Sequence, residues 1–249
     1  MNDRVEGLII READFKDSSV IITVLTEPYG KISFVARGIR KMTSKNRGSL
    51  LPYTKGEFFF DYREGKTMFS LKTAGTKELY RFVHEDLNAS LAAGVLAEVI
   101  DSFLVDGTEG SVSLQCFRIM EESLTLLNEK HRADIVLAAA LGELTALLGI
   151  APDVDECVLC GNTSVAAISV KEGGFLCTEC ALRYGALIRE PIELKRFRLV
   201  NKAGLAHVPV LKEHMEGALA ECGILVDLIR MHGGLPVKSY ALFQRMFSG

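Results

Sequence analysis

Four of the six cysteines in this 249-residue sequence form two closely spaced pairs. Two residues separate Cys157 from Cys160, two separate Cys177 from Cys180, and sixteen residues lie between the pairs. A C-x2-C-x16-C-x2-C arrangement is typical of a four-thiolate zinc site, because each short turn aims two sulfurs at one point. Four sulfur ligands complete a tetrahedron and leave no open position, so the metal is expected to be structural. We predict one structural Zn²⁺ ion held by Cys157, Cys160, Cys177 and Cys180.

The residues between the two cysteine pairs predict a β-hairpin. Residues 166–170 and 175–176 are mostly apolar, and residues 171–174 read Lys-Glu-Gly-Gly, which suits a turn. This hairpin would bring the second pair back to the first, and we expect the zinc-bearing insert at about residues 152–184. Free thiols or a redox pair are the alternatives. Cys116 and Cys222 lie on apolar helical faces and are predicted to be small buried side chains.

A second group of residues with binding chemistry is a basic stretch without acids. No Asp or Glu occurs between Glu27 and Glu57, whereas seven Lys and Arg do. Flexible cations on a loop rich in Gly, Ser, Thr and Asn suit contacts with the phosphate backbone of a nucleic acid. An ordinary solvated loop is the alternative. The predicted DNA-binding residues are Lys31, Arg37, Arg40, Lys41, Lys45, Arg47 and Lys55.

Aromatic side chains beside this stretch could stack on bases. Alternate aromatics in a strand usually face the core, so at most two of these five are expected to be exposed. The candidates are Tyr53, Phe58, Phe59, Phe60 and Tyr62.

Sequence patterns of catalysis are missing. Gly65-Lys66-Thr67 resembles the end of a phosphate-binding loop, but Phe60 occupies the position where that loop needs a glycine. The sequence contains no H-E-x-x-H, no G-x-S-x-G and no G-x-G-x-x-G leading into a helix, and the five histidines are scattered. We therefore expect no catalytic residues and no enzyme. A zinc enzyme, the alternative, would need an open coordination position.

The predicted secondary structure that positions these residues changes from strands to helices near residue 80. Short apolar stretches separated by turn residues predict five strands, which suit a small barrel of the OB type, with an SH3-like barrel as the alternative. The predicted strands are 5–10, 20–25, 31–36, 57–62 and 67–71. From Thr76 onward apolar residues recur at steps of three and four, which indicates helices. The predicted helices are 76–103, 112–127, 134–148, 194–200, 209–231 and 236–247.

The fold class is therefore α+β with two domains, a barrel at residues 1–80 and a helical domain at residues 81–249 that contains the zinc insert. With 48% apolar and 24% charged residues, the composition excludes a disordered or fibrous chain. The net charge of −3 combines unlike parts. Residues 1–80 hold fourteen basic and ten acidic residues, a net of +4, whereas the remainder holds fifteen and twenty-two, a net of −7. Contact with nucleic acid is thus expected of the barrel.

The N-terminal residues contain no apolar run behind a basic start, so no signal peptide is expected. We predict a cytoplasmic protein that associates with the nucleoid when it is bound to DNA. In that compartment cysteines serve as metal ligands or free thiols more often than as disulfides.

Taken together, these features resemble the RecO family of bacterial DNA repair and recombination mediators along the whole chain. The resemblance rests on the order and spacing of several short segments. They are Gly7-Leu8-Ile9-Ile10, the run from Asp17 to Thr26, Tyr29-Gly30-Lys31, the run from Val35 to Arg40, Leu51-Pro52-Tyr53, the two cysteine pairs and Lys238-Ser239.

The resemblance implies a DNA repair and recombination function. A RecO-type OB domain would bind single- and double-stranded DNA and promote annealing of complementary strands. The protein would assist loading of the RecA recombinase onto DNA coated with single-strand-binding protein (SSB). Its partners would be RecR and the acidic C-terminal tail of SSB, for which a pocket near Arg118 or Arg132 is a candidate. The alternative is a zinc-containing protein-interaction module without a direct DNA role.

Overall fold

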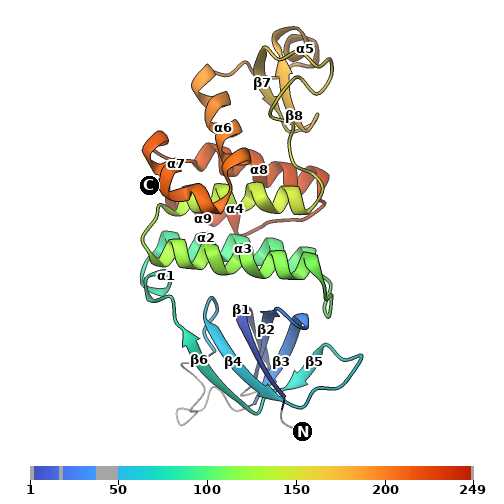
Figure 1. Cartoon of the computed structure of the whole chain (residues 1–249), viewed down its shortest axis with the longest axis vertical. Helices are drawn as coiled ribbons and strands as arrows, with labels where there is room; N and C mark the ends of the chain where they lie inside the picture. Colours follow the sequence, from blue (N-terminus) through green and yellow to red (C-terminus); the bar gives the residue numbers. More distant parts are fainter. Residues whose placement is uncertain (1–2, 17–18, 38–49, 248–249) are drawn as a thin grey trace. The chain divides into compact units, whose positions relative to one another are not determined.

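The computed structural model describes residues 3–16, 19–37 and 50–247. It is an α+β structure in which a curled sheet comes first in the chain, and helices with a two-stranded hairpin follow (Figure 1). The chain divides into two compact units, residues 1–128 and 129–249. The last strand of the sheet ends at Glu78 and the first helix begins at Arg81. The predicted division into domains at residue 80 stays a prediction.

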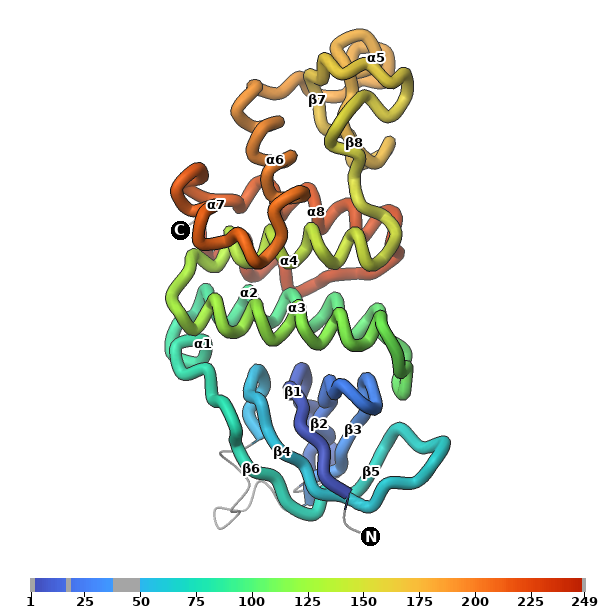
Figure 2. The backbone as a smooth tube through the Cα atoms, viewed as in Figure 1, coloured from blue at the N-terminus to red at the C-terminus, as the bar shows by residue number. Residues whose placement is uncertain are grey.

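The curled sheet of the first unit contains six strands in the order β5-β3-β2-β1-β4-β6. The strands are β1 (Asp3–Phe15), β2 (Ser19–Thr26), β3 (Gly30–Ala36), β4 (Lys55–Phe60), β5 (Met68–Ser70) and β6 (Thr73–Glu78). Neighbours are antiparallel except β3 and β5, which are parallel. Figure 2 shows β1 between β2 and β4. The alternating aromatics of β4 fill the sheet's interior, because Phe58 and Phe60 are fully buried against Phe34.

The sixth strand is not among the five that the sequence predicts. Residues 73–78 read Thr-Ala-Gly-Thr-Lys-Glu, which has no alternation of apolar and polar side chains, and most of them are exposed. The sequence pattern instead places the start of a helix at Thr76. Only Leu71 and Lys72 separate β5 from β6. The chain therefore passes directly from the strand that pairs with β3 to the strand that pairs with β4.

Among the described residues of the first unit, three helices follow the sheet. They are α1 (Arg81–Glu85), α2 (Leu87–Phe103) and α3 (Ser111–Asn128). The predicted helix over 76–103 is interrupted at Asp86, whose backbone is extended and whose side chain accepts a hydrogen bond from the amide of Ala89. That bond is a helix N-cap, so Asp86 ends α1 and starts α2. Helices α2 and α3 contact the strands of the sheet.

The second unit places a two-stranded hairpin within a set of helices. Its elements are α4 (Ala133–Leu147), β7 (Val165–Ser169), β8 (Gly174–Cys177), α5 (Thr178–Tyr184), α6 (Pro191–Ala203), η2 (Leu205–His207), α7 (Val208–His214), α8 (Leu219–His232) and α9 (Tyr240–Phe247). Helix α4 is buried on nearly all sides, and α8, α6 and α7 contact it. None of the helices that the structure describes is long and apolar enough to cross a membrane.

The helix predicted over 209–231 forms as two helices, α7 and α8. In the segment between these helices, the amide of Ala218 donates a hydrogen bond over 2.8 Å to Oδ2 of the buried acid Asp134. Asp134 is 1% exposed and also accepts from Arg132 and from its neighbour's amide. The hairpin predicted between the cysteine pairs is present as β7 and β8.

Candidate metal centre and nucleic-acid interface

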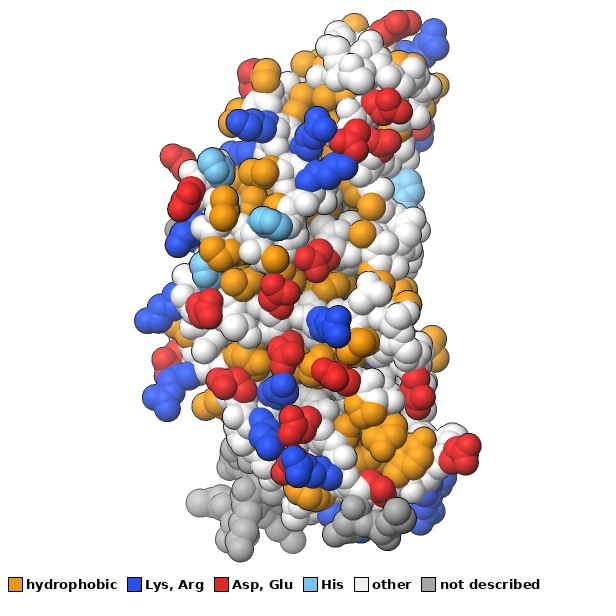
Figure 3. Space-filling model, viewed as in Figure 1, with side chains coloured by type: hydrophobic (Ala, Val, Ile, Leu, Met, Phe, Trp, Pro, Cys, Tyr) orange, Lys and Arg blue, Asp and Glu red, His pale blue; other side chains and the backbone are white. Residues whose placement is uncertain are grey.

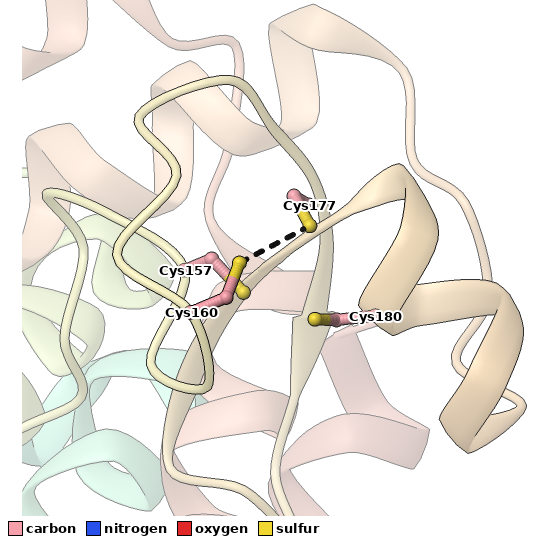
Figure 4. A group of neighbouring side chains, drawn as sticks. All are labelled: Cys157, Cys160, Cys177 and Cys180. Atoms are coloured by element: carbon pink, nitrogen blue, oxygen red, sulfur yellow. Dashed lines mark hydrogen bonds between the residues drawn. The ribbon is translucent and has the colours of Figure 1, made fainter.

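The first cysteine pair lies on a tight turn ahead of β7. The amide of Gly161 donates to the carbonyl of Cys157 over 2.8 Å, and the amide of Cys157 donates to the carbonyl of Asn162 over 2.9 Å. Gly161 has a φ of 72°, the left-handed conformation that glycine adopts without strain. These bonds fold the chain back after Cys160, so that both sulfurs of the pair face the same side (Figure 4).

The second pair is positioned differently, at a junction between a strand and a helix. Cys177 is the last residue of β8 and the N-cap of α5, and Cys180 lies in the first turn of that helix. Strand β8 carries Cys177 back toward the first pair, as the pairing of Val165 with Cys177 places the ends of β7 and β8 together. Hence one sulfur pair comes from a turn and the other from a helix start.

All four sulfurs lie within 4.8 Å of one another. The Sγ atoms of Cys160 and Cys177 are 3.6 Å apart, as the dashed line in Figure 4 marks. Zn–S bonds of about 2.3 Å in a tetrahedron place two sulfurs about 3.8 Å apart. The spacing therefore suits four ligands of one metal ion, and it is far longer than a disulfide bond of about 2.05 Å. Cys157 and Cys177 are buried and Cys160 is exposed.

Ionisation of the cysteines differs within the cluster. Burial would raise the pKa of Cys157, but hydrogen bonds from the backbone of Cys177, Leu159 and Cys160 lower this pKa to about 6. Burial, followed by the neighbouring sulfurs, raises the pKa of Cys180 to about 12. One thiolate therefore forms readily in this cluster, whereas a second negative charge on a neighbouring sulfur is unfavourable. A bound cation would stabilise both thiolates.

The basic stretch of the first unit is described only in part. Arg37 follows the end of β3 and is exposed. The predicted DNA-binding residues Arg40, Lys41, Lys45 and Arg47 lie outside the described residues. Because Arg37 leads directly into that segment, it marks the strand end from which the segment starts.

Lys31, also predicted to bind DNA, is held inside the first unit. Its side chain is 8% exposed, and Nζ lies 3.0 Å from Asp101 Oδ1 and 3.1 Å from Asp106 Oδ1. Nζ also donates to the backbone carbonyl of Asp101 over 2.6 Å, at the C-terminal end of α2. Arg11 shares the same carboxylate over 3.2 Å. These interactions support a structural role for Lys31 that joins β3 to α2.

Lys55 is likewise paired with an acid of a helix. Its Nζ donates to Glu121 Oε1 of α3 over 2.5 Å and lies 5.8 Å from the ring centre of Phe117. The hydrogen bond to Glu121 raises the pKa of Lys55. Of the seven predicted DNA-binding cations, the described ones thus comprise two that are paired with distant acids and one, Arg37, that is exposed. DNA binding by all seven stays a prediction.

Sequence reasoning missed a second cationic area on the sheet. A pocket of about 330 Å³ lies at β5 and the segments on either side of it in the chain, and Arg63, Lys66 and Met68 line it together with Asp61, Phe69, Ser70 and Lys72. Arg63, Lys66 and Met68 are exposed. Figure 3 shows hydrophobic side chains gathered over the sheet near β5. The signal in the sequence is Arg63-Glu64-Gly65-Lys66, whose composition by itself predicts only a turn.

An aromatic pair lies beside this pocket. The rings of Tyr29 and Tyr62 are stacked, with their centres 4.8 Å apart, and Tyr62 is 36% exposed. Of the five aromatic candidates, Phe58 and Phe60 are buried. Tyr62 therefore offers the most accessible stacking face of the five.

Two family models match the chain. The model described as "Recombination protein O N terminal" matches residues 1–80. The model described as "Recombination protein O C terminal" matches residues 84–240. Together the two matches include both the basic stretch and the four cysteines.

Several curated proteins with similar sequences are named DNA repair protein RecO. One from Syntrophomonas wolfei is 30% identical over 82% of this chain and 81% of its own length. One from Bacillus pumilus is 30% identical over 70% of this chain and 67% of its own length. One from Bacillus subtilis is 28% identical over all of this chain and 96% of its own length.

Proposed function

The chain belongs to the RecO family, whose role is in DNA repair and recombination, and from this membership we propose that it acts on DNA strands directly. It binds single- and double-stranded DNA, promotes annealing of complementary strands and assists RecA loading on DNA coated with SSB. The observation that carries this proposal is the match of both halves of the chain to the family. The protein is a mediator and not an enzyme.

The proposed DNA path begins on the curled sheet. The net charge of +4 on residues 1–80 favours phosphate binding there. Arg37, with the cations at positions 40, 41, 45 and 47, would contact phosphates. Arg63 and Lys66 extend the cationic surface, and Tyr62 beside them offers a ring on which a base stacks. Lys31 and Lys55 contribute by holding the sheet against α2 and α3. The part of their positive charge that the neighbouring carboxylates leave uncompensated also attracts phosphates.

The sheet is proposed to be a barrel of the OB type. In support, β1 pairs with both β2 and β4, and the segment β5–β6 pairs with β3 at one end and with β4 at the other. Counted as one bent strand, β5 and β6 make a ring of five. A five-stranded ring is what the OB architecture would require, and a face of that architecture binds oligonucleotides.

Annealing on such a surface needs no covalent chemistry. Two strands repel each other through their phosphates, and bound cations lower that repulsion. Holding both strands on one protein also raises their effective concentration. Binding to phosphates is independent of sequence, as a general annealing activity requires.

Zinc is proposed as the metal of the cysteine cluster. Four thiolates at tetrahedral spacing suit Zn²⁺ and leave no position for substrate. The ion would fix β7, β8 and α5 to one another, since the buried cluster around it holds few residues besides the cysteines, namely Ala167, Leu176 and Ala181.

The proposed partners are RecR and the acidic C-terminal tail of SSB, besides DNA. The protein would reside in the cytoplasm and associate with the nucleoid while it is bound to DNA. These expectations come from the family, and each depends on the DNA-binding activity above.

Strand annealing, measured with and without SSB, tests the proposal. Two complementary oligonucleotides, one labelled with a fluorophore and the other with a quencher, report duplex formation. We expect the full chain to accelerate annealing of bare strands and of strands coated with SSB. Absence of acceleration on bare strands would refute the proposed activity.

A zinc-containing protein-interaction module without a DNA role is the second candidate. It is favoured by the pairing of Lys31 and Lys55 with carboxylates, which removes two cations from the surface. A salt titration of binding to a single-stranded oligonucleotide separates the two candidates. DNA binding predicts an affinity that falls steeply with salt concentration, whereas the interaction module predicts no binding.

A further inference from the structure

The four cysteines of the cluster differ in their exposure to solvent. Cys160 lies in an exposed stretch, residues 159–164, whereas Cys177 at the end of β8 is 3% exposed. The two residues are nevertheless in direct contact, with their Sγ atoms 3.6 Å apart (Figure 4). A sulfur that a dissolved oxidant reaches thus lies against a sulfur that is shielded from it.

The contact between Cys160 and Cys177 links the two cysteine pairs to each other. Cys160 belongs to the turn ahead of β7, and Cys177 is the N-cap of α5. A disulfide bond of about 2.05 Å requires the two sulfurs to approach by about 1.5 Å. Rotation of the exposed Cys160 side chain supplies a movement of this size. Formation of this bond therefore needs only a local change.

Cys157 is less suited to form a disulfide with Cys160. Its side chain is buried, and its sulfur accepts hydrogen bonds from three backbone amides, including that of Cys177. A disulfide sulfur is uncharged and accepts hydrogen bonds more weakly than a thiolate does. Pairing of Cys157 would thus weaken bonds that hold the turn together, whereas pairing of Cys160 with Cys177 leaves the Cys157 sulfur as their acceptor.

We propose that the cluster is a redox-sensitive site at which hydrogen peroxide joins Cys160 to Cys177 and releases the metal. The Cys160 thiolate attacks one peroxide oxygen, so that an S–O bond forms and the O–O bond breaks. The Cys177 thiolate then attacks the sulfur of this sulfenic acid, so that the S–S bond forms and the S–O bond breaks. Each step releases one hydroxide, which takes up a proton to become water. Two thiolates lose two electrons in total, and one peroxide molecule gains them.

The disulfide would replace the cross-link that the metal provides. A metal ion that loses two of its four sulfur ligands is bound much more weakly. The new bond still ties the turn of Cys160 to the start of α5, across the sixteen residues that separate Cys160 from Cys177. The hairpin would therefore stay closed without metal. Release of metal rests on the proposed zinc ion, whereas formation of the disulfide does not.

The test treats the full zinc-loaded chain with a small excess of hydrogen peroxide. Remaining thiols are alkylated, trypsin digests the protein without reductant, and fragmentation mass spectrometry assigns the linked cysteines. Cleavage after Lys171 separates the two cysteine pairs, so a link between the pairs joins two peptides. We expect a link between Cys160 and Cys177. A link within either pair, or no link, would overturn the proposal.

A zinc indicator measures metal release in the same samples. We expect one zinc ion to be released for each disulfide, and a dithiol reductant with added zinc to reverse both changes. Disulfide formation with the zinc retained would overturn the proposed release. A chain that holds no zinc before oxidation refutes the zinc assignment alone, because its disulfide map still tests the link.

Two matched variants provide a further readout. Cys160→His and Cys180→His each leave three cysteines and one histidine, which is a common set of zinc ligands. We expect Cys180→His to release zinc at the rate of the unmodified chain, because the reacting pair is intact. Cys160→His is expected to release it about tenfold more slowly or less, because the exposed thiolate is missing. Equal rates in the two variants would contradict the proposal.

Limited proteolysis tests whether the disulfide replaces the metal as a cross-link. We expect the oxidised, metal-free chain to resist cleavage within residues 152–184 as the zinc-loaded chain does. The reduced chain, treated with a chelator, is expected to be cleaved there faster, since neither cross-link is present. Equally fast cleavage of both metal-free forms would overturn the proposed replacement.

Discussion

Lys31 Nζ lies 3.0 Å from Asp101 Oδ1 and 2.6 Å from the backbone carbonyl oxygen of the same residue. Lys31 is the second residue of β3, and Asp101 lies in the last turn of α2. The cation thus meets both a carboxylate and the negative end of a helix dipole. One buried side chain therefore ties the sheet to the helix that follows it.

Replacing Lys31 with methionine is expected to destabilise the protein. The change keeps the apolar stem but leaves the partly buried carboxylate of Asp101 and the exposed one of Asp106 without this cation, at a cost of about 1–3 kcal/mol. Denaturant unfolding measures the decrease in stability. A normal free energy of unfolding would contradict the structural role.

The same variant also tests whether Lys31 binds DNA. If Lys31 acts only through Asp101, the folded variant binds DNA with an unchanged salt dependence. If Lys31 instead pairs with a phosphate of single-stranded DNA, its replacement lowers the slope of log affinity against log salt by about 0.7.

Substituting alanine for five cations of the basic stretch is expected to weaken DNA binding and flatten its salt dependence. The variant combines changes at Arg37, Arg40, Lys41, Lys45 and Arg47. Each cation that pairs with a phosphate of a single strand contributes about 0.7 to the slope of log affinity against log salt. The decrease in this slope therefore gives the number of such pairs. Fluorescence anisotropy over a range of salt measures it. Arg118→Ala, at an exposed residue of α3, is a control. A slope equal to that of the unmodified protein would exclude this stretch from the interface.

Cys177→Ser is expected to abolish metal binding and to destabilise the hairpin that carries the cysteines. The buried cluster around the cysteines contains only Ala167, Leu176 and Ala181 besides Cys157 and Cys177, and Phe175 packs separately against Phe197 of α6, so folding of the cysteine region and metal binding are expected to be coupled. Metal analysis and circular dichroism with and without a chelator measure both effects. Cys116→Ser, at a buried cysteine outside the cluster, is the control that keeps its metal. Full stability of the chelated protein would make the metal incidental.

Metal affinity is expected to rise with pH. The pKa of Cys157 is lowered to about 6, so this sulfur is a thiolate above pH 6 and protons compete with the metal as the pH falls through that value. The pKa of Cys180 is raised to about 12, so the metal must displace its proton at any lower pH. Both effects have the same sign. Competition with a zinc indicator from about pH 5.5 to about pH 8 measures the slope, and a flat profile would argue against thiolate ligation.

Asp134→Ala is expected to destabilise the second unit by about 1–3 kcal/mol, because it leaves the buried amide of Ala218 without an acceptor, whereas the amide of Ile135 keeps the carbonyl of Arg132. Asp134 accepts from the amides of Ile135 and Ala218 and from the Arg132 side chain. Arg132→Ala is the matched variant. It removes a half-exposed partner of the same acid and should cost at most about 1 kcal/mol. Denaturant unfolding compares the free energies of unfolding of the two variants. Equal losses would contradict the conclusion that the backbone hydrogen bonds to Asp134 contribute more than the Arg132 side chain.

Spacing along the chain is sufficient to identify the cysteine cluster. Two residues within each cysteine pair, and a hairpin between the pairs, determine most of the geometry locally. The switch from period two to period three and four likewise locates the change from strands to helices. Both signals lie within short windows of sequence, where local geometry decides the structure.

Features that depend on distant residues are not predictable in this way. The charges of Lys31 and Lys55 are compensated by Asp101 and Glu121, which are 70 and 66 residues away. A count of acids near the basic stretch cannot detect such pairs. The break between α7 and α8 involves a bond from Ala218 to Asp134, which precedes it by 84 residues. Strand β6 forms by pairing with β4 and has no apolar pattern of its own.

The two outer strands of the sheet also affect whether copies of the molecule aggregate at high concentration. Strand β5 is three residues long, and β6 is mostly exposed and contains Gly75 and Lys77. Short, charged or glycine-containing outer strands are poor templates for strand addition from another chain. If copies bind side by side on one DNA molecule, as the proposed function implies, they face one another closely. The form of these edges disfavours edge-to-edge aggregation under that crowding.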